Sequence, residues 1–315
     1  MNNKKILIIG GSGALGKTLL KRYHKQNDII VVSRDEHKHV FLSKKYDNVN
    51  FQIGDVKDKD SIMKAISDYK PQIIINAAAL KHVPICESNV FESVKTNIIG
   101  HQNLIDCINA NNHKIEALIF ISTDKACKPI NVYGMSKAIA ERLYVNFSEK
   151  QKDIKVIISR YGNVLESTGS VIPFFKKLLN NGCDYLPITD KNMTRFLMSL
   201  DDAVDLIEWS YKKEDSHGKI VVPKMKSLRI VDIADELSIS IIGDHTTLKH
   251  VGIRPGEKID EEMISLEESL RTVECERYYM ITNKIINQKS WSYNSRDNIL
   301  ERSKVNKFLK DRGVV

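Results

Sequence analysis

The sequence has no apolar run long enough to cross a membrane and no amino-terminal export signal. Its longest apolar runs, residues 6–9 and 73–80, are far shorter than the roughly 20 residues that a membrane-spanning helix needs. The amino terminus passes from two asparagines and two lysines straight into a strand-like segment, without the apolar stretch of a signal peptide. We therefore expect a cytoplasmic protein with no membrane partner.

Cysteine, glycine, proline and clustered histidine are also scarce. Five cysteines without a Cys-x-x-Cys pair predict reduced thiols, and 15 glycines and 7 prolines leave little room for collagen-like or disordered chain. The histidines form no His-x-x-x-His pair or Cys/His cluster, so we expect no metal site. The net charge of +8 comes from lysines spread over the whole chain, without a recognisable nucleic-acid module, so we expect no nucleic-acid partner.

What the sequence does contain is an alternation of short apolar segments and longer amphipathic ones. Strands without polar alternation are typical of a parallel sheet that helices cover on both faces. The pattern therefore predicts an α/β protein with a Rossmann-type, doubly wound parallel sheet. The predicted strands are residues 6–9, 29–33, 50–53, 73–76, 117–122 and 155–160.

A glycine-rich loop follows the first predicted strand and opens a helix. Gly10, Gly13 and Gly16, with Ala14 between them, place backbone N–H groups and a helix N-terminus where they can hold a pyrophosphate. The segment from Gly11 also matches the P-loop pattern Gly-x-x-x-x-Gly-Lys-Thr, for which Asp124 would be the magnesium carboxylate. The loop alone does not decide between a dinucleotide and a nucleoside triphosphate.

The end of the second strand bears on which dinucleotide would bind. Ser33 and Arg34 stand where an acidic residue usually meets the ribose, and an arginine there suits a 2′-phosphate. We therefore favour NADP over NAD, although Asp35 could still reach a ribose. Asp55 and Val56 follow the third strand and would lie near the adenine, but Asp55 is equally compatible with an ordinary capping role.

The chemical centre is expected at the end of the fifth strand. Tyr133 and Lys137 are four residues apart, which places both side chains on one face of a helix. An ammonium beside a phenol lowers the phenol's pKa and makes a base that can deprotonate an alcohol. Thr123, Asp124 and Lys125 stand at the carboxyl edge of the sheet, where an adjacent acid and amine can divide acid and base chemistry.

Five further motifs carry a resemblance to a known family. Together with the glycine loop and Tyr-x-x-x-Lys, they resemble the inverting UDP-N-acetylglucosamine 4,6-dehydratases, in the polysaccharide-biosynthesis branch of the extended short-chain dehydrogenases/reductases. The resemblance spans about residues 4 to 270 and disfavours the P-loop alternative. The motifs are 77–84 (Ala-Ala-Ala-Leu-Lys-His-Val-Pro), 122–126 (Ser-Thr-Asp-Lys-Ala), 160–164 (Arg-Tyr-Gly-Asn-Val), 193–196 (Met-Thr-Arg-Phe) and 254–258 (Arg-Pro-Gly-Glu-Lys).

The resemblance implies a reaction and a role for each central residue. Tyr133, assisted by Lys137, would deprotonate the carbon-4 hydroxyl of the sugar as NADP takes the hydride, with Thr123 hydrogen-bonded to the same oxygen. Lys125 would remove the carbon-5 proton, and Asp124 would assist loss of the carbon-6 hydroxyl as water. Retaining relatives have Glu in place of Lys125, so the lysine implies an inverted 4-keto-6-deoxy sugar.

The resemblance also implies residues that bind cofactor and substrate, and a homo-oligomeric assembly. Ala77, Lys81, Tyr133 and Lys137 would contact the cofactor. One position departs from the family pattern, where Thr168 replaces an arginine that reaches phosphate. A homo-oligomer is expected by resemblance alone. The implied substrate contacts are Lys81, Asn163, Val164, Val171, Arg195 and Arg254.

These assignments predict a chain of two interleaved units. Residues 1–165 would form the NADP-binding Rossmann domain, to which 192–215 return. Residues 166–191 and 216–315 would form mainly the smaller substrate domain and the C-terminal tail, because the strand–helix alternation weakens after Asn163. A nucleotide-sugar 4-epimerase of the same fold is the nearest alternative, but it does not need an acid and an amine side by side.

Overall fold

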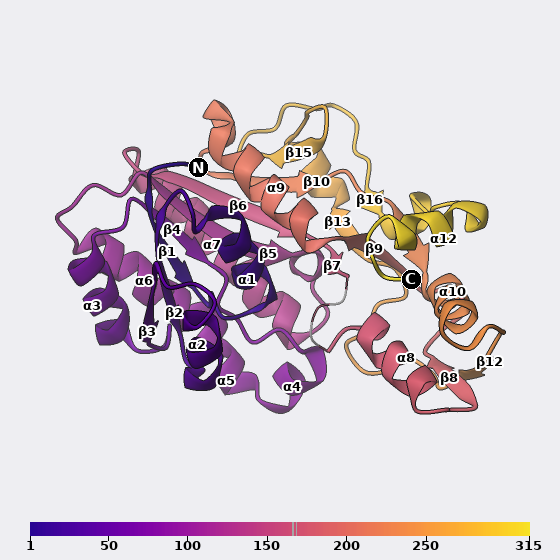
Figure 1. Ribbon diagram of the computed structural model, residues 1–315. Helices are drawn as coiled ribbons and strands as arrows, with labels where there is room; N and C mark the ends of the chain where they lie inside the picture. The colour runs from indigo at the N-terminus through magenta and orange to yellow at the C-terminus, as the bar shows by residue number, and fades with distance from the viewer. Residues whose placement is uncertain (166, 168) are drawn as a thin grey trace.

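The computed structural model describes residues 1–165, 167 and 169–315 and is built on one nine-stranded sheet (Figure 1). The sheet has the order β14-β15-β10-β6-β5-β4-β1-β2-β3, and all pairs from β10 to β3 are parallel. All six predicted strands are confirmed. Their bounds are β1 Lys5–Ile9, β2 Asp28–Ser33, β3 Val49–Ile53, β4 Ile73–Asn76, β5 Ala117–Thr123 and β6 Lys155–Tyr161.

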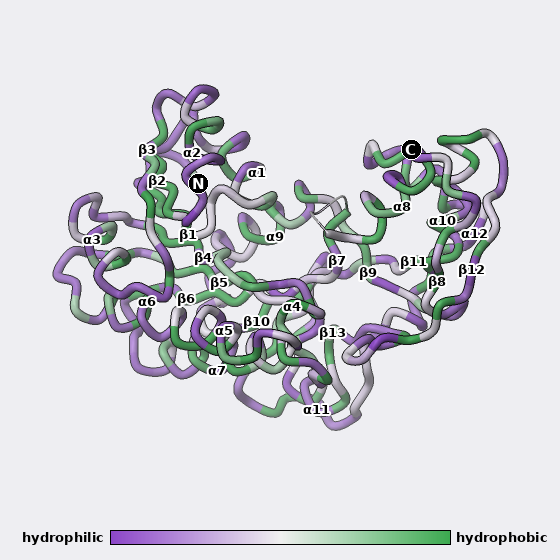
Figure 2. Tube along the Cα trace, turned by 90° about the horizontal axis from the view of Figure 1, so that it is seen from below, coloured by the Kyte–Doolittle hydropathy of each residue, from purple (hydrophilic) through white to green (hydrophobic). Residues whose placement is uncertain are grey.

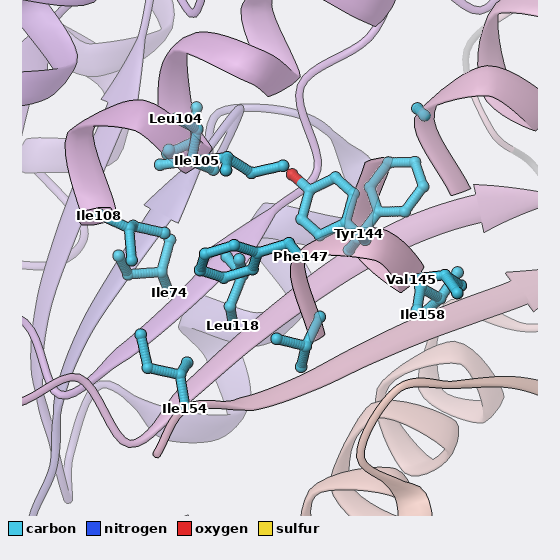
Figure 3. Close-up of a cluster of buried hydrophobic side chains, with 14 of the residues drawn as sticks. Ile74, Leu104, Ile105, Ile108, Leu118, Tyr144, Val145, Phe147, Ile154 and Ile158 are labelled. Carbon is cyan, nitrogen blue, oxygen red and sulfur yellow. The ribbon is translucent and has the colours of Figure 1, made fainter. Parts of the chain in front are cut away.

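Helices cover both faces of the sheet, as the unbroken apolar strands predicted. Alternate residues of each strand point to opposite faces, so Ile6 and Ile8 pack on α1, α2 and α9, whereas Leu7 and Ile9 pack on α3, α6 and α7. Figure 3 shows the second of these clusters, in which residues of α6 and α7 lie over β4, β5 and β6. The bounds are α1 Ala14–Tyr23, α2 Glu36–Ser43, α3 Lys59–Tyr69, α6 Gly100–Asn109, α7 Val132–Lys150 and α9 Leu200–Lys212.

A second, smaller core lies beyond the carboxyl edge of the sheet (Figure 2). Apolar residues of three helices and several short strands pack together there and share no buried residue with the two clusters of the large sheet. The short sheet β11-β9-β7 joins the two units, whereas β12-β8 belongs to the smaller one. The bounds are α8 Val171–Asn180, α10 Ile230–Ile242, α12 Arg302–Lys310, β7 Asn163–Val164, β8 Tyr185–Ile188, β9 Thr194–Met198, β11 Ser227–Arg229 and β12 Thr247–His250.

Residues 216–315, expected mainly in the substrate unit, also supply three strands to the large sheet. β10 (Lys219–Pro223) pairs in parallel with β6, and β15 (Tyr278–Ile281) and β14 (Thr272–Glu274) follow it as antiparallel strands. The antiparallel edge carries too few residues in each strand for the apolar pattern to stand out in the sequence. α9, within the segment 192–215, packs its Ala203, Val204 and Ile207 on the large sheet.

The remaining elements surround the carboxyl edge of the sheet. The five cysteines are free, and Cys86, Cys107 and Cys127 are buried. Within the described part of the chain, none of the helices combines the length and the apolar character needed to pass through a bilayer. The bounds are α4 Val83–Ser88, α5 Val90–Val94, a π-helical turn Lys95–Ile99, a 3₁₀ turn Asp124–Ala126, β13 Glu262–Ile264, α11 Leu266–Ser269 and β16 Tyr293–Asn294.

Candidate active site

The glycine loop forms a tight turn against the end of β4 and leads directly into α1. Gly10 has φ +80°, and a Cβ there would lie 2.8 Å from the amide nitrogen of Ala78. A Cβ on Gly16 would lie 2.1 Å from the carbonyl oxygen of Gly11, so the backbone reaches this closeness only with glycine. The first turn of α1 holds no acidic residue. The loop therefore fits the pyrophosphate of a dinucleotide at a helix N-terminus.

The P-loop alternative is not supported by the same geometry. The Gly13 amide donates to the Gly10 carbonyl over 3.1 Å, so the loop closes on itself where a P-loop would open around a phosphate. The hydroxyl of Thr18 donates to the carbonyl of Ala14 over 3.2 Å, within the helix. Asp124, the expected magnesium carboxylate, is fully buried and paired with Lys125.

The charged side chains at the ends of β2 and β3 differ in how closely they are paired with other groups. Asp35 caps α2 by accepting from the amide of Lys38 over 3.0 Å, and the ammonium of Lys38 lies 2.6 Å from its carboxylate. Arg34 is exposed, and its one ion pair within the described residues, with Asp55, is 3.9 Å long. Asp55 accepts from the amide of Lys57 over 3.0 Å in the turn after β3, whereas the cap of α3 is Asp58. An anion at this edge would therefore meet the guanidinium of Arg34 before the carboxylate of Asp35.

Three other expected cofactor residues lie at the same edge of the sheet. Val56 is buried, and a Cβ on Gly100 would lie 2.7 Å from its Cγ1, so it packs β3 against α6. Ser33 is buried and donates to the hydroxyl of Ser12 in the glycine loop over 2.8 Å. Ala77 donates its amide to the carbonyl of Ile9 over 2.9 Å and so lies directly beside the loop. The structure therefore gathers the expected cofactor residues at one edge of the sheet.

Thr123, Asp124 and Lys125 leave β5 in a 3₁₀ turn, and a second carboxylate joins them. The Nζ of Lys125 lies 3.2 Å from Asp124 Oδ1 and 3.1 Å from Glu261 Oε1. The Thr123 hydroxyl donates to Asp124 Oδ1 over 2.9 Å. The carbonyl oxygen of the Asn163 side chain lies 3.5 Å from the same ammonium, which links β7 to the pair. Asp124 and Lys125 thus form the adjacent acid and amine that the sequence predicted.

The pKa shifts in this group follow from burial and from its charges. Burial raises the pKa of Asp124 above its ordinary value, and the charge of Glu261 adds to that effect against the opposing Lys125. Burial disfavours the Lys125 ammonium, yet the anions of Asp124 and Glu261 outweigh it and raise the pKa of Lys125. Burial also opposes the Glu261 carboxylate, but Lys125 and Arg195 lower its pKa. Lys125 therefore holds a proton here, and Asp124 is the carboxyl that protonates more readily.

Tyr133 and Lys137 lie on α7 beside this group, but the structure does not show the contact that their spacing suggested. Burial raises the pKa of Tyr133, which a hydrogen bond with Thr123 partly opposes, and Lys137 makes no contribution. The Lys137 ammonium donates to the carbonyl of Ile121 over 2.6 Å and lies 4.1 Å from the centre of the Phe120 ring. Burial lowers the pKa of Lys137 to about 7. In this arrangement Lys137 does not lower the pKa of the Tyr133 phenol.

The expected substrate residues differ in how many of their donors are free. Arg195 is buried, and its guanidinium donates to the carbonyls of Thr194, Lys258 and Ile259 over 2.7–2.9 Å. It therefore holds the backbone of the 254–262 segment. Arg254 is exposed, and in the part of the chain that the structure describes it has one ion pair, of 4.0 Å to Glu257 in its own loop. Of these two arginines, Arg254 is the one whose donors can reach a diphosphate.

The other expected substrate positions surround the same edge. Lys81 is exposed in the loop that follows β4. Val164, in β7, packs against the large sheet, and Val171, the first residue of α8, packs against the smaller core. Thr168, where the family has an arginine, lies outside the described residues.

A segment far along the chain, residues 254–262, lies over the same edge of the sheet. Asn131, the cap of α7, donates to the carbonyl of Gly256 over 2.7 Å, and the Lys258 ammonium donates to the carbonyl of Cys127 over 2.8 Å. The sequence motif identified this segment by Arg254 but did not single out Glu261, its contact with Lys125. A buried acidic residue has no local pattern that distinguishes it from the adjacent Glu262.

The comparisons with known proteins agree with this site. A family model described as polysaccharide biosynthesis protein matches residues 6–283. A UDP-N-acetylglucosamine 4,6-dehydratase (inverting) of Campylobacter jejuni is 43% identical over 292 residues, which cover 90% of this chain and 84% of that protein. A UDP-glucose 4-epimerase of Rickettsia typhi is 37% identical over 291 residues, with 89% and 83% covered.

Solved structures extend the similarity to the whole fold. The structure of Pen from Bacillus thuringiensis is 29% identical, covers 100% of this chain and 99% of its own, and superposes with a TM-score of 0.92. Solved dTDP-glucose 4,6-dehydratases with NAD bound are 19% identical, which shows a common fold. The family match and the curated relatives decide the classification: the chain belongs to the polysaccharide biosynthesis protein family, a branch of the extended short-chain dehydrogenases/reductases.

Proposed function

We propose that the protein removes water from UDP-N-acetylglucosamine across carbons 5 and 6 and inverts carbon 5. The product would be UDP-2-acetamido-2,6-dideoxy-L-hexos-4-ulose, a precursor for deoxyamino sugars and glycans. The observation that carries this proposal is the Asp124–Lys125 pair, an acid and an amine 3.2 Å apart at the end of β5 and beside Tyr133. Family membership and the 43% identity to an inverting dehydratase support the same activity.

A nicotinamide dinucleotide fits the glycine loop and would supply the hydride acceptor for carbon 4 and the hydride donor for carbon 6. Gly10, Gly13 and Gly16 would hold its pyrophosphate on the N-terminus of α1. We infer a preference for NADP, because the exposed Arg34 is available for a 2′-phosphate while Asp35 is engaged by α2 and Lys38.

Tyr133 would take the proton of the carbon-4 hydroxyl. Its pKa is raised by burial, so the phenol is protonated at rest and must release that proton to solvent before it acts as a base. Thr123, which shares a hydrogen bond with Tyr133, would orient the same substrate oxygen. Oxidation at carbon 4 then acidifies the proton on carbon 5.

Asp124 and Lys125 would act as one proton-exchanging pair. The Lys125 ammonium passes its proton to Asp124 over 3.2 Å, which leaves a neutral amine and a carboxylic acid. The amine removes the carbon-5 proton, and the acid protonates the carbon-6 hydroxyl, so that one water leaves. The pair is then again an ammonium and a carboxylate, and a proton from solvent added to the face of carbon 5 opposite Lys125 gives the inverted product.

The direct test follows the wild-type protein with UDP-N-acetylglucosamine in deuterated water by proton NMR. The proposal predicts a new carbon-6 methyl signal and loss of the carbon-5 proton, with ring couplings of the inverted sugar. A product that keeps its carbon-6 hydroxymethyl group and changes only at carbon 4 would establish the epimerase alternative. Unchanged substrate with cofactor bound would overturn the assigned substrate.

A further inference from the structure

The carboxylate of Glu261 completes the coordination of the Lys125 ammonium. An ammonium group has three N–H donors, and Lys125 has three acceptors within 3.5 Å. They come from three separate parts of the chain: Asp124 beside β5, Asn163 in β7 and Glu261 in the 254–262 segment. The direction of the Lys125 side chain is therefore set jointly by all three.

Glu261 is itself fixed more firmly than a surface carboxylate. Its amide donates to the hydroxyl of Ser295 over 2.9 Å, and its carbonyl accepts from the amide of Ser295 over 2.8 Å. Arg195 binds the carbonyl groups of Lys258 and Ile259 in the same segment, and its Nε lies 3.8 Å from Glu261 Oε1. Glu261 is 2% exposed, and a charge buried this deeply is costly unless it has partners.

The two carboxylates that contact Lys125 are not equivalent. Each has one buried oxygen without a hydrogen-bond partner among the described residues, namely Asp124 Oδ2 and Glu261 Oε2. Their pKa values are displaced in opposite directions, upward for Asp124 and downward for Glu261. Asp124 is therefore suited to receive a proton, whereas Glu261 is suited to remain an anion.

We propose that Glu261 is a positioning residue that orients Lys125 and supplies the fixed negative charge beside which Lys125 and Asp124 exchange a proton. The inference rests on the proposed function and deepens it. Glu261 acts through Lys125 and carries no proton to or from the sugar. Glu261 also connects the Asp124–Lys125 pair to the 254–262 segment, which bears Arg254 and Lys258.

The charges around Lys125 determine what loss of Glu261 would do. Asp124 and Glu261 are the negative neighbours, Arg195 from β9 is the positive one, and Lys258 faces Glu261. A negative neighbour raises the pKa of an amine and of a carboxyl alike, because it favours the protonated form of each. Removing the charge of Glu261 therefore lowers the pKa of both members of the pair, and both limbs of the pH–rate profile move to lower pH.

The first test is Glu261→Gln, with kcat, KM and the pH–rate profile measured for dehydration of UDP-N-acetylglucosamine. We expect kcat to fall roughly 10- to 100-fold at neutral pH, part of the 10²–10⁴ that general acid–base groups contribute, with little change in KM. The profile should move to lower pH, and Glu261→Asp should return it toward the wild-type position. If kcat of Glu261→Gln falls by the same factor at every pH, so that the profile keeps its position, the inference is overturned.

The adjacent residue provides a matched control. Glu262 is also a carboxylate paired with a lysine, at 2.8 Å from the exposed Lys128, but it has no contact with Lys125. Glu262→Gln should leave kcat, KM and the position of the profile within about twofold of wild type. An equal displacement of the profile in both variants would mean that general surface charge, and not the Glu261 contact, sets it.

A second measurement tests Glu261 without reliance on turnover. The Lys125 side chain is 20% exposed, so its acetylation by acetic anhydride can be followed by mass spectrometry as a function of pH. The midpoint, the pH at which the acetylation rate of Lys125 is half its maximum, should fall by about one unit in Glu261→Gln and stay unchanged in Glu262→Gln. An unmoved midpoint would reject the role of Glu261. A wild-type protein that forms no 4-keto product would reject the proposed function alone, since the labelling result stands independently.

Discussion

Arg160 and Glu268 are joined by two hydrogen bonds of 2.8 and 2.9 Å, although 108 residues separate them in the chain. On its other side the same guanidinium binds Glu141 of α7 through bonds of 2.6 and 2.9 Å. Arg160 is 1% exposed, and Ser122 donates to Glu141 over 2.6 Å. This buried network ties β6, α7 and α11 together directly behind the catalytic end of β5.

Glu268→Gln should destabilise the protein by about 3 kcal/mol, because it leaves the buried Arg160 with one charged partner in place of two. The measurement is the free energy of unfolding in urea at neutral pH. Glu267→Gln is the control, since the Glu267 side chain is 72% exposed and its carboxylate lies 3.2 Å from Nε of the buried Arg271. That change should cost less than about 1 kcal/mol. Equal losses of unfolding free energy in the two variants would show that the buried network adds nothing to stability.

The same carboxylate should make stability sensitive to acid. Burial opposes the Glu268 anion, but Arg160 lowers the pKa of Glu268 from 4.5 to about 2. A carboxyl whose folded-state pKa is depressed contributes stability above its unfolded pKa and loses it as the pH falls toward the folded value. Wild type should lose on the order of 2 kcal/mol from this group between about pH 5 and about pH 3. Urea midpoints should fall less steeply over that range in Glu268→Gln, and parallel slopes would contradict the assignment.

Two buried tyrosines of α7 allow catalytic and structural roles to be separated. Tyr133→Phe should lower kcat by roughly 10²- to 10⁴-fold, because the hydroxyl proposed to take the carbon-4 proton is gone. Tyr144 donates no proton to the substrate in this scheme. Its hydroxyl accepts from Asn76 over 2.9 Å and lies 3.0 Å from His101. Tyr144→Phe should therefore lower stability by about 1 kcal/mol and preserve kcat. Steady-state kinetics and thermal unfolding of both variants test the distinction.

The architecture of the large sheet could be predicted from sequence because its strands are apolar on both faces. The run from Ile6 to Ile9 and the isoleucines of 73–75 fit only strands covered by helices on either side. The edge strands β14 and β15 were not predicted, because three or four residues give no periodicity above chance. The position of the site followed from β5 ending at Thr123, since ligands bind at the carboxyl ends of parallel strands.

The contacts within the site were less predictable than its position. The four-residue spacing of Tyr133 and Lys137 placed both on α7, but it could not show that the Lys137 ammonium binds the carbonyl of Ile121. The expected role of Arg195 as a substrate ligand was based on resemblance, whereas its donors bind backbone carbonyls. Glu261 was missed because its contact with Lys125 depends on tertiary packing across 136 positions, which no local motif encodes.

Arg34→Ala should weaken NADPH binding by about tenfold or more and change NADH binding little, because the guanidinium is free to reach a 2′-phosphate that NADH lacks. Fluorescence titration of both cofactors gives the two dissociation constants. Lys44→Ala removes a positive charge from the other end of α2 and should leave the ratio unchanged. Equal weakening of both cofactors in Arg34→Ala would contradict the assigned preference for NADP.

Lys125→Ala should abolish both dehydration and exchange of the carbon-5 proton with solvent, because the amine that removes this proton is gone. Tyr133 remains, so oxidation at carbon 4 should still proceed and leave bound reduced nicotinamide, visible by its absorbance. Lys128 offers the matched control: it lies three residues later, is 54% exposed and pairs with Glu262. The Lys128→Ala variant should exchange the carbon-5 proton and dehydrate the substrate at the wild-type rate. Proton NMR in deuterated water distinguishes these outcomes. If carbon-5 exchange survives in Lys125→Ala, Lys125 is not the base, and Asp124 or Glu261 would have to take the proton.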